Sequence, residues 1–231
     1  IQIDAALVSS SKNRRYLTGF DATSSVVIVT REESYFLTDF RYFEAAQKKI
    51  KGCKTVMYTK LSESIREILK RHHLKNILVE YANLSLQDAE TYENIFEQEG
   101  AHAVKDKTLD GLLSALRCIK TPEEIEKIKS AQAITDAAFA HILQKITPGV
   151  TEREIALEIE FFMRKQGAEG VAFELIVVSG ANGSMCHGVP SEKVIEKGDF
   201  ITMDTGALLN GYHSDMTRTV AVGQVSEEQR H

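Results

Sequence analysis

Residues 198–219 read GDFITMDTGALLNGYHSDMTRT, and this stretch decides how the second half of the chain folds. Two β-rich runs flank the pair Asn210-Gly211. An Asn-Gly pair in this setting favours a type I′ turn, because both turn residues must adopt positive φ. A two-residue turn pairs Leu209 with Tyr212, and this pairing fixes the register of the whole predicted hairpin.

The predicted register brings two aspartates to one face. Counting outward from the turn places Asp204 opposite Thr217, and Asp215 points to the same side because strand side chains alternate. Diagonal neighbours lie roughly 7 Å apart at the backbone, so the two carboxylates can converge. The same face carries His213, Thr217 and Thr219. The other face is predicted to be apolar and holds Met203, Ala207, Leu209, Met216, Val220 and Val222, with Arg218 as the exception.

Paired carboxylates on a partly buried floor suggest a metal site. They repel each other unless they are protonated or neutralised, and a divalent cation is a common solution. Two cations about 3.5–4 Å apart fit over such a floor, and oxygen ligands favour a hard ion such as Mn²⁺. The spacing alone leaves another interpretation open, in which Asp204 and Asp215 are ordinary side chains beside a turn. Two ligands do not make a closed site.

Two helices precede the hairpin, and each opens on a capping box. Thr121 is followed by Pro122 and then by Glu124, which suits a helix start, and Thr151 and Glu154 repeat the pattern. The first helix is predicted to bury Ile125, Ile128, Ala131, Ile134, Ala138 and Ile142. The second is predicted to bury Ile155, Leu157, Ile159 and Phe162.

The chain divides into two predicted domains with a boundary near Lys120. Residues 1–118 alternate strands and helices, which indicates an α/β domain with a mixed sheet. Its strands are predicted over 5–8, 26–30, 35–38, 55–58 and 77–80, and its helices over 62–72 and 85–98. Residues 119–231 are predicted to be an α+β domain, with the two helices followed by strands over 174–179, 199–209 and 212–223.

Composition narrows the class of protein. Hydrophobic residues make up 43% and charged residues 26% of the chain, a globular profile. The net charge of -5 comes without a basic stripe, which argues against nucleic acid as a partner. The apolar runs are too short to span a bilayer, so we expect no membrane association. Three scattered cysteines and the lack of a signal peptide ahead of the first strand predict a cytoplasmic protein.

Several motifs resemble the pita-bread metallopeptidases, which include Xaa-Pro aminopeptidases and Xaa-Pro dipeptidases (prolidases). Residues 204–219 are similar to the family's Asp-x-Gly-Ala and Ser-Asp-x-Thr-Arg-Thr signature, with its two aspartates eleven residues apart. Residues 179–191 resemble the family's Ser-Gly-x-Asn and His-Gly-x-Pro-Ser loop. The opening at 117–125 also matches, and residues 15–20 and 38–42 resemble the creatinase-like domain that precedes the catalytic domain.

The resemblance implies a fold, a metal site and a missing segment. The fold is a creatinase-like N-terminal α/β domain followed by the first half of a pita-bread domain. Family members bind two divalent ions through two aspartates, a histidine and two glutamates. Asp204 matches the ligand of one ion and Asp215 the bridging ligand. The other three ligands belong to a second half, so we expect a C-terminally truncated chain that is inactive and metal-free by itself. Mn²⁺ is the expected metal of the complete protein, with Co²⁺ or Zn²⁺ as alternatives.

Two histidines complete the predicted site. His187 matches the family histidine outside the metal shell, whose implied role is to contact the substrate or the tetrahedral intermediate. His213 shares the aspartate face and is a candidate for lining the substrate pocket. Cys186 stands where prolidase-type sequences commonly have proline, and no base is specified beside it, so we do not expect a nucleophile.

The implied activity is metal-dependent hydrolysis of peptide bonds that precede proline. The substrates would be short peptides with proline in the second position, and the resemblance implies a homodimer. A creatinase-like hydrolase without metal is an alternative, although creatinase-type sequences do not keep the aspartate pair. A non-catalytic pita-bread binding module is another. A methionine aminopeptidase is disfavoured because the N-terminal α/β domain is not expected in it.

Overall fold

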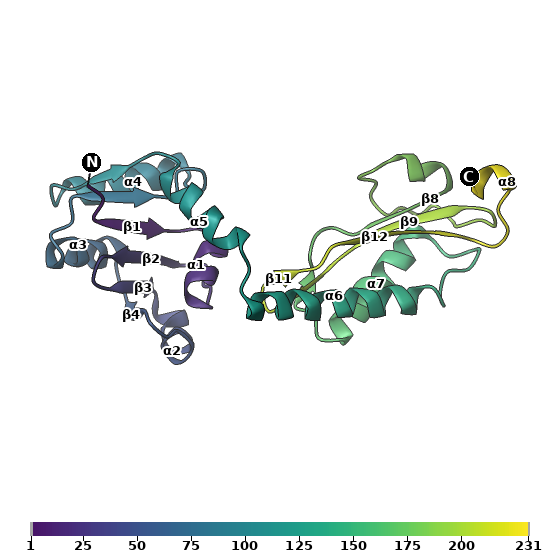
Figure 1. Ribbon diagram of the computed structural model, residues 1–231, viewed down its shortest axis with the longest axis horizontal. Helices are drawn as coiled ribbons and strands as arrows, with labels where there is room; N and C mark the ends of the chain where they lie inside the picture. Colours follow the sequence, from purple (N-terminus) through teal and green to yellow (C-terminus); the bar gives the residue numbers. More distant parts are fainter. Residues whose placement is uncertain (1, 231) are drawn as a thin grey trace. The chain divides into compact units, whose positions relative to one another are not determined.

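The computed structural model describes residues 2–230, and the chain falls into two units, Ile1–Ile119 and Lys120–His231. Figure 1 follows the chain through both. Among the helices of residues 2–230, none combines the length and the apolar character that crossing a membrane requires.

The N-terminal unit is built on a mixed sheet with the strand order β4-β3-β2-β1-β5-β6. The strands span Ala5–Val8 (β1), Ser25–Thr30 (β2), Ser34–Thr38 (β3), Lys54–Met57 (β4), Asn76–Val79 (β5) and His102–Val104 (β6). β2 runs antiparallel to both of its neighbours, β1 and β3, whereas the other three pairs are parallel. This arrangement confirms the predicted α/β domain with a mixed sheet.

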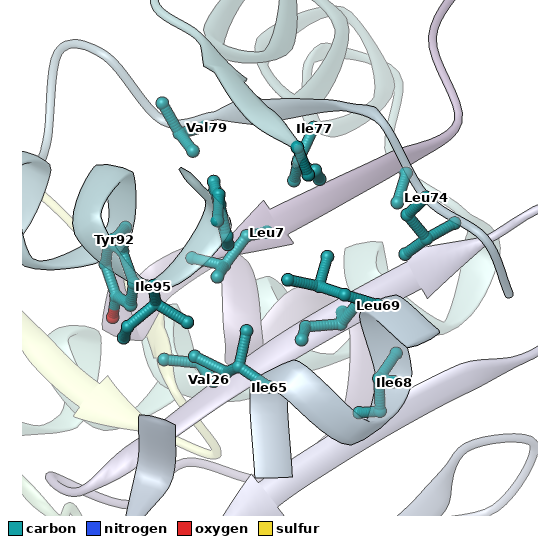
Figure 2. Packing of buried hydrophobic residues seen from close by; sticks show 14 of the residues in the cluster. Leu7, Val26, Ile65, Ile68, Leu69, Leu74, Ile77, Val79, Tyr92 and Ile95 are labelled. Carbon is teal, nitrogen blue, oxygen red and sulfur yellow. The ribbon is translucent and has the colours of Figure 1, made fainter. Parts of the chain in front are cut away.

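Helices cover both faces of this sheet. They span Ser11–Thr18 (α1), Phe40–Lys49 (α2), Leu61–Arg71 (α3), Leu86–Glu97 (α4) and Thr108–Cys118 (α5). One core packs α3 and α4 against one sheet face (Figure 2), and a second core packs α2 and α5 against the other. Neighbouring residues enter opposite cores, as Leu7 and Val8 show. The strands therefore read as continuous apolar runs, because both of their faces are buried.

Four elements of this unit were not predicted: α1, α2, α5 and β6. Helix α1 has no apolar stripe, and its buried side chains are polar. Arg14, for example, donates to the carbonyl oxygens of Ser25 at 2.7 Å and Ala22 at 2.9 Å. β6 has only three residues, too few to show an alternating pattern. The five predicted strands are all present, with ends that differ by about one residue.

The C-terminal unit packs two helices against two small sheets. The helices are α6 (Pro122–Ile142) and α7 (Glu152–Lys165), and a short helix α8 spans Glu227–Arg230. The strands are β7 (Gly170–Val171), β8 (Ile176–Ser179), β9 (Phe200–Thr205), β10 (Ala207–Leu209), β11 (Tyr212–His213) and β12 (Met216–Ala221). One sheet has the order β12-β9-β8 and the other β11-β10-β7. The 3₁₀ helix η1 (Gly180–Ser184) follows β8.

Both capping boxes form as predicted, with Thr121 and Thr151 as N-cap residues. The predicted apolar faces need two corrections. Ile125 is 43% exposed and Leu157 59% exposed, so neither belongs to the core. On α6 the buried stripe instead runs through Thr135, whose hydroxyl has a buried partner on the hairpin. On α7 it ends on Met163, in register with the buried isoleucines one and two turns before it.

The hairpin forms in the predicted register, but its strands are interrupted. Leu209 pairs with Tyr212, and Asp204 pairs with Thr217. Asn210 and Gly211 have φ of 52° and 75°, as a type I′ turn requires. The prediction of two continuous strands was wrong. Each strand breaks near its middle, so that the turn end belongs to one three-stranded sheet and the open end to the other.

Candidate metal centre

A buried hydroxyl network holds the hairpin at the point where its strands break. The hydroxyls of Thr135 on α6 and Ser214 lie 2.7 Å apart. Both accept from the amide of Ala207, at 3.1 Å and 2.9 Å. A Cβ placed on Gly206 would lie 2.1 Å from the carbonyl oxygen of Ser214. Glycine is therefore required for the two sides of the hairpin to approach this closely. With Ser214 turned into the core, the next residue, Asp215, is exposed.

Asp204 occupies the central strand of its sheet. It is half-buried on β9, opposite Thr217 of β12 on one side and Ile176 of β8 on the other. The Thr217 hydroxyl donates to one Asp204 carboxylate oxygen at 2.7 Å, which fixes the rotamer of the aspartate. Asp215 lies two residues before Thr217, between β11 and β12. The register thus places the two aspartates on one face of the hairpin.

The donor chemistry of this face fits a hard divalent cation. Carboxylate oxygens are the ligands that Mn²⁺, Mg²⁺ and Ca²⁺ prefer, and both aspartates are open to a ligand on the polar side. The two supply only part of a coordination shell. Within residues 2–230, no third histidine, cysteine, aspartate or glutamate gathers with them closely enough to share an ion.

Among the described residues, possible ligands do gather in the N-terminal unit, at Glu93, Glu97 and His102. The Glu93 carboxylate is already paired with Lys105 at 2.6 Å. The other two side chains are exposed, as surface acidic groups commonly are. This group is far from the hairpin in sequence and belongs to a different unit.

The two predicted histidines occupy different elements. His213 lies on β11, opposite Leu208, and its side chain is exposed on the aspartate side of the hairpin. His187 lies in the loop that leaves β8 after η1, and its side chain is also exposed. β8 pairs with β9, so the loop begins beside the strand that carries Asp204.

The His187 loop is attached to the rest of the unit by residues that were not predicted as functional. The buried Glu152 carboxylate accepts hydrogen bonds from Ser179, Asn182 and Ser191. Burial acts to raise the pKa of Glu152, but these hydrogen bonds outweigh it and hold the pKa below its ordinary value. In the sequence Glu152 is only the residue after a cap, and no local pattern links it to a loop some thirty residues on.

A second attachment involves Lys193. Its ammonium group contacts the Asp199 carboxylate at 2.7 Å and the Ser179 hydroxyl at 3.1 Å. Burial acts to raise the pKa of Asp199, and the hydrogen bond from Lys193 contributes to lowering it overall. A Cβ on Gly180, which has a φ of +53°, would lie 2.6 Å from the same carboxylate, so the turn out of β8 needs glycine.

Comparison with known proteins agrees with these features. The family model of the creatinase/prolidase N-terminal domain matches residues 1–119, and that of metallopeptidase family M24 matches residues 126–231. A Xaa-Pro dipeptidase of Pyrococcus furiosus is 36% identical over 99% of this chain. The chain spans 63% of the length of that relative.

Solved structures of peptidases with similar names share the fold of this chain. A Xaa-Pro dipeptidase from Bacillus anthracis superimposes with a TM-score of 0.92 at 41% identity, covering 99% of this chain and 63% of that one. An X-Pro aminopeptidase from Thermotoga maritima superimposes with a TM-score of 0.90 at 32% identity, covering 99% and 65%. Fold and sequence together define a two-domain metallopeptidase architecture. The chain belongs to the family defined by the creatinase/prolidase N-terminal domain, and its residues 126–231 match metallopeptidase family M24.

Proposed function

We propose that this protein, at the full length of its relatives, is a metal-dependent peptidase that cleaves Xaa-Pro bonds in short peptides. The observation that carries the proposal is the hairpin that places Asp204 and Asp215 on one face, inside the unit that matches family M24. The names of the similar proteins, Xaa-Pro dipeptidase and X-Pro aminopeptidase, supply the substrate class. Activity on Xaa-Pro dipeptides, compared with activity on longer peptides, distinguishes a dipeptidase from an aminopeptidase.

Asp204 and Asp215 would hold two divalent ions, with Mn²⁺ as the best match to oxygen ligands. Both aspartates would be ligands, and the remaining ligands would come from the part of the full-length relatives that this chain does not span. When bound, such ions polarise a carbonyl and make water more acidic. Within this chain, Thr217 keeps the Asp204 carboxylate in one orientation by donating to it. A ligand that does not have to be reoriented binds metal with less loss of entropy.

His187 is the proposed substrate contact outside the metal shell. Its imidazole is exposed on the loop after β8 and is free to donate to a substrate carbonyl or to the oxyanion that forms from it. His213, exposed on the aspartate side of the hairpin, is proposed to line the pocket. We also propose a cytoplasmic homodimer.

The first test replaces Asp215 with Asn in the protein of full family length. The variant should lose Xaa-Pro peptidase activity and bound metal while it keeps its fold, because Asn removes the carboxylate charge of a ligand but little volume. Metal content is measured by mass spectrometry, activity on Xaa-Pro dipeptides and longer peptides, and fold by circular dichroism. Asp136→Asn on the exposed side of α6 is the matched control and should keep both metal and activity. Near-normal turnover of the Asp215 variant under limiting metal would refute the two-metal site.

His187→Ala separates substrate contact from metal binding. It should lower kcat by about 10²–10³-fold, the cost of removing one donor to a developing oxyanion, with metal content unchanged. Loss of stoichiometric metal in this variant would instead place His187 among the ligands. A wild-type protein that binds no metal and hydrolyses no Xaa-Pro peptide would point to the creatinase-like or binding-module alternatives.

A further inference from the structure

Both ends of the loop that carries His187 donate hydrogen bonds to the same carboxylate, that of Glu152. Glu152, the first residue of α7, has no exposed surface. One of its oxygens accepts from the Ser179 amide at 2.7 Å, the Ser179 hydroxyl at 2.9 Å and the Asn182 side chain at 3.1 Å. The other accepts from the Ser191 hydroxyl at 2.7 Å and the Ser191 amide at 3.2 Å. Residues 180–190 therefore form a closed loop whose two ends share one buried acceptor.

The start of α7 reinforces this closure. The amide of Glu152 donates to the carbonyl oxygen of Lys193, and the amide of Arg153 donates to that of Ser191, each at 3.1 Å. These are amides of the first helical turn, which have no partner inside the helix. The helix N-terminus also favours a negative charge, so the buried carboxylate is stabilised where it stands.

A third contact lies next to His187 itself. Gly188 is buried, and a Cβ placed on it would lie 2.5 Å from Cγ1 of Val178 on β8 and 3.3 Å from the carbonyl oxygen of Met185. The backbone at Gly188 is thus pressed against the strand that precedes the loop. His187 remains exposed although the chain on both sides of it is fixed. A loop that is anchored at its ends and its middle, yet presents an imidazole to solvent, is built to orient that imidazole.

We propose that Glu152 is a positioning residue, which closes the loop at residues 180–190 and thereby holds His187 in the orientation that the substrate requires. The role of His187 rests on the proposed function, whereas the closure of the loop does not. Glu152 makes no contact with the substrate in this scheme. It acts through the loop.

The first experiment uses the 231-residue chain and needs no activity. In Glu152→Gln, an amide group replaces one carboxylate oxygen and faces hydrogen-bond donors, so one end of the loop must detach. Hydrogen exchange of the amides in 180–190 should rise by about tenfold or more, while exchange in α6 and β9 stays unchanged. The ring protons of His187 should move in NMR spectra toward the shifts of an unstructured peptide.

Two further variants keep this experiment decisive. Glu154→Gln alters the capping box of the same helix, where Glu154 contacts Thr151 rather than the loop, and should leave loop exchange unchanged. Ser191→Ala removes one donor and keeps the carboxylate charge, so it should loosen the loop by a few-fold even if Glu152→Gln does not fold. Unchanged loop exchange and unchanged His187 resonances in Ser191→Ala and in a folded Glu152→Gln would overturn the proposal.

The second experiment tests whether Glu152 acts through His187. In the protein of full family length, Glu152→Gln should lower kcat with metal content unchanged. The same substitution should have no further effect once His187 is alanine, because the residue it positions is gone. If it slows the His187→Ala enzyme as much as it slows the wild type, the carboxylate works by another route and the proposal fails. If the full-length protein proves inactive, the proposed function fails, and the exchange and NMR results still decide the closure.

Discussion

Glu80 is the N-terminal unit's counterpart of Glu152. It is fully buried and directly follows β5. Its carboxylate accepts from the amide and the hydroxyl of Ser10, at 2.7 Å and 2.6 Å, and from the side chain of Asn13 at 2.6 Å. Both carboxylates are satisfied by neutral donors rather than by a cation. Burial acts to raise the pKa of Glu80, and hydrogen bonds led by those from Ser10 more than offset this and lower the pKa.

Glu80→Gln should destabilise the N-terminal unit by roughly 3 kcal/mol, because an amide cannot accept from all of these donors and leaves some of them buried without a partner. Urea unfolding followed by circular dichroism measures the loss, and hydrogen exchange should locate it in α1, which begins at Ser11. Glu90→Gln, an exposed position on α4, is the control and should change stability little. Equal stability of the two variants would contradict the role given to Glu80.

The lowered pKa of Glu80 also predicts that the protein loses stability at acidic pH. Because its folded-state pKa lies below the ordinary value of 4.5, Glu80 stabilises the fold fully above about pH 4.5. That contribution declines as pH falls through the folded-state pKa, where the folded protein takes up the proton. Unfolding free energy measured against pH should therefore fall below pH 4.5 in the wild type and fall less steeply in Glu80→Gln.

At the scale of elements, the break in the hairpin divides its strands between two sheets. An uninterrupted hairpin would keep its two strands together in one sheet. Here Gly206 and Ser214 cross closely, and the strands continue into a second sheet. The crossing is fastened to α6 through Thr135, so the segment that ends in Asp215 is fixed by a helix as well as by its partner strand.

Ser214→Ala should destabilise the C-terminal unit by about 2 kcal/mol, because the hydroxyl bonds to Thr135 and Ala207 in a buried site. Urea unfolding of the 231-residue chain provides the measurement. Ser130→Ala on the exposed side of α6 is the matched control, and it should be neutral or slightly stabilising since the Ser130 hydroxyl bonds only back to its own helix. A neutral Ser214→Ala would show that the network does not hold the crossing.

At the scale of the whole molecule, the C-terminal unit presents an open sheet edge. Within residues 2–230, β12 pairs with β9 alone, so its outer edge has backbone donors and acceptors to offer. An unpaired edge strand invites another chain. We expect residues 1–231 to associate, with light scattering giving species larger than 25.8 kDa. A monodisperse monomer at micromolar concentration would contradict this expectation.

The same chain should bind Mn²⁺ weakly and show no peptidase activity, because two carboxylates leave most of a coordination shell to water. Calorimetric titration should reveal no tight two-site binding, and Xaa-Pro peptides should remain intact. The control is the protein of full family length, which should bind two ions under the same conditions. Tight stoichiometric binding by residues 1–231 would mean that the site lies elsewhere in the chain.

Local sequence was sufficient for the parts of this protein that local chemistry specifies. The Asn210-Gly211 turn fixed the hairpin register, and hence the shared face of Asp204 and Asp215, because a type I′ turn permits only one pairing. The capping boxes at Thr121 and Thr151 marked two helix starts for a similar reason, since each box satisfies backbone amides within four residues.

Tertiary structure decided what depends on partners distant in sequence. Helix α1 has no apolar period, and Glu80, some seventy residues on, accepts hydrogen bonds from its N-cap residue Ser10 and from Asn13. At the break beside Gly206, the amide of Ala207 donates to the hydroxyl of Thr135 on helix α6. The burial of Glu152 requires donors from both ends of a loop that begins 27 residues later. A buried charge or hydroxyl is tolerated only where its hydrogen bonds are complete, and this is a property of the folded chain that no stretch of sequence displays.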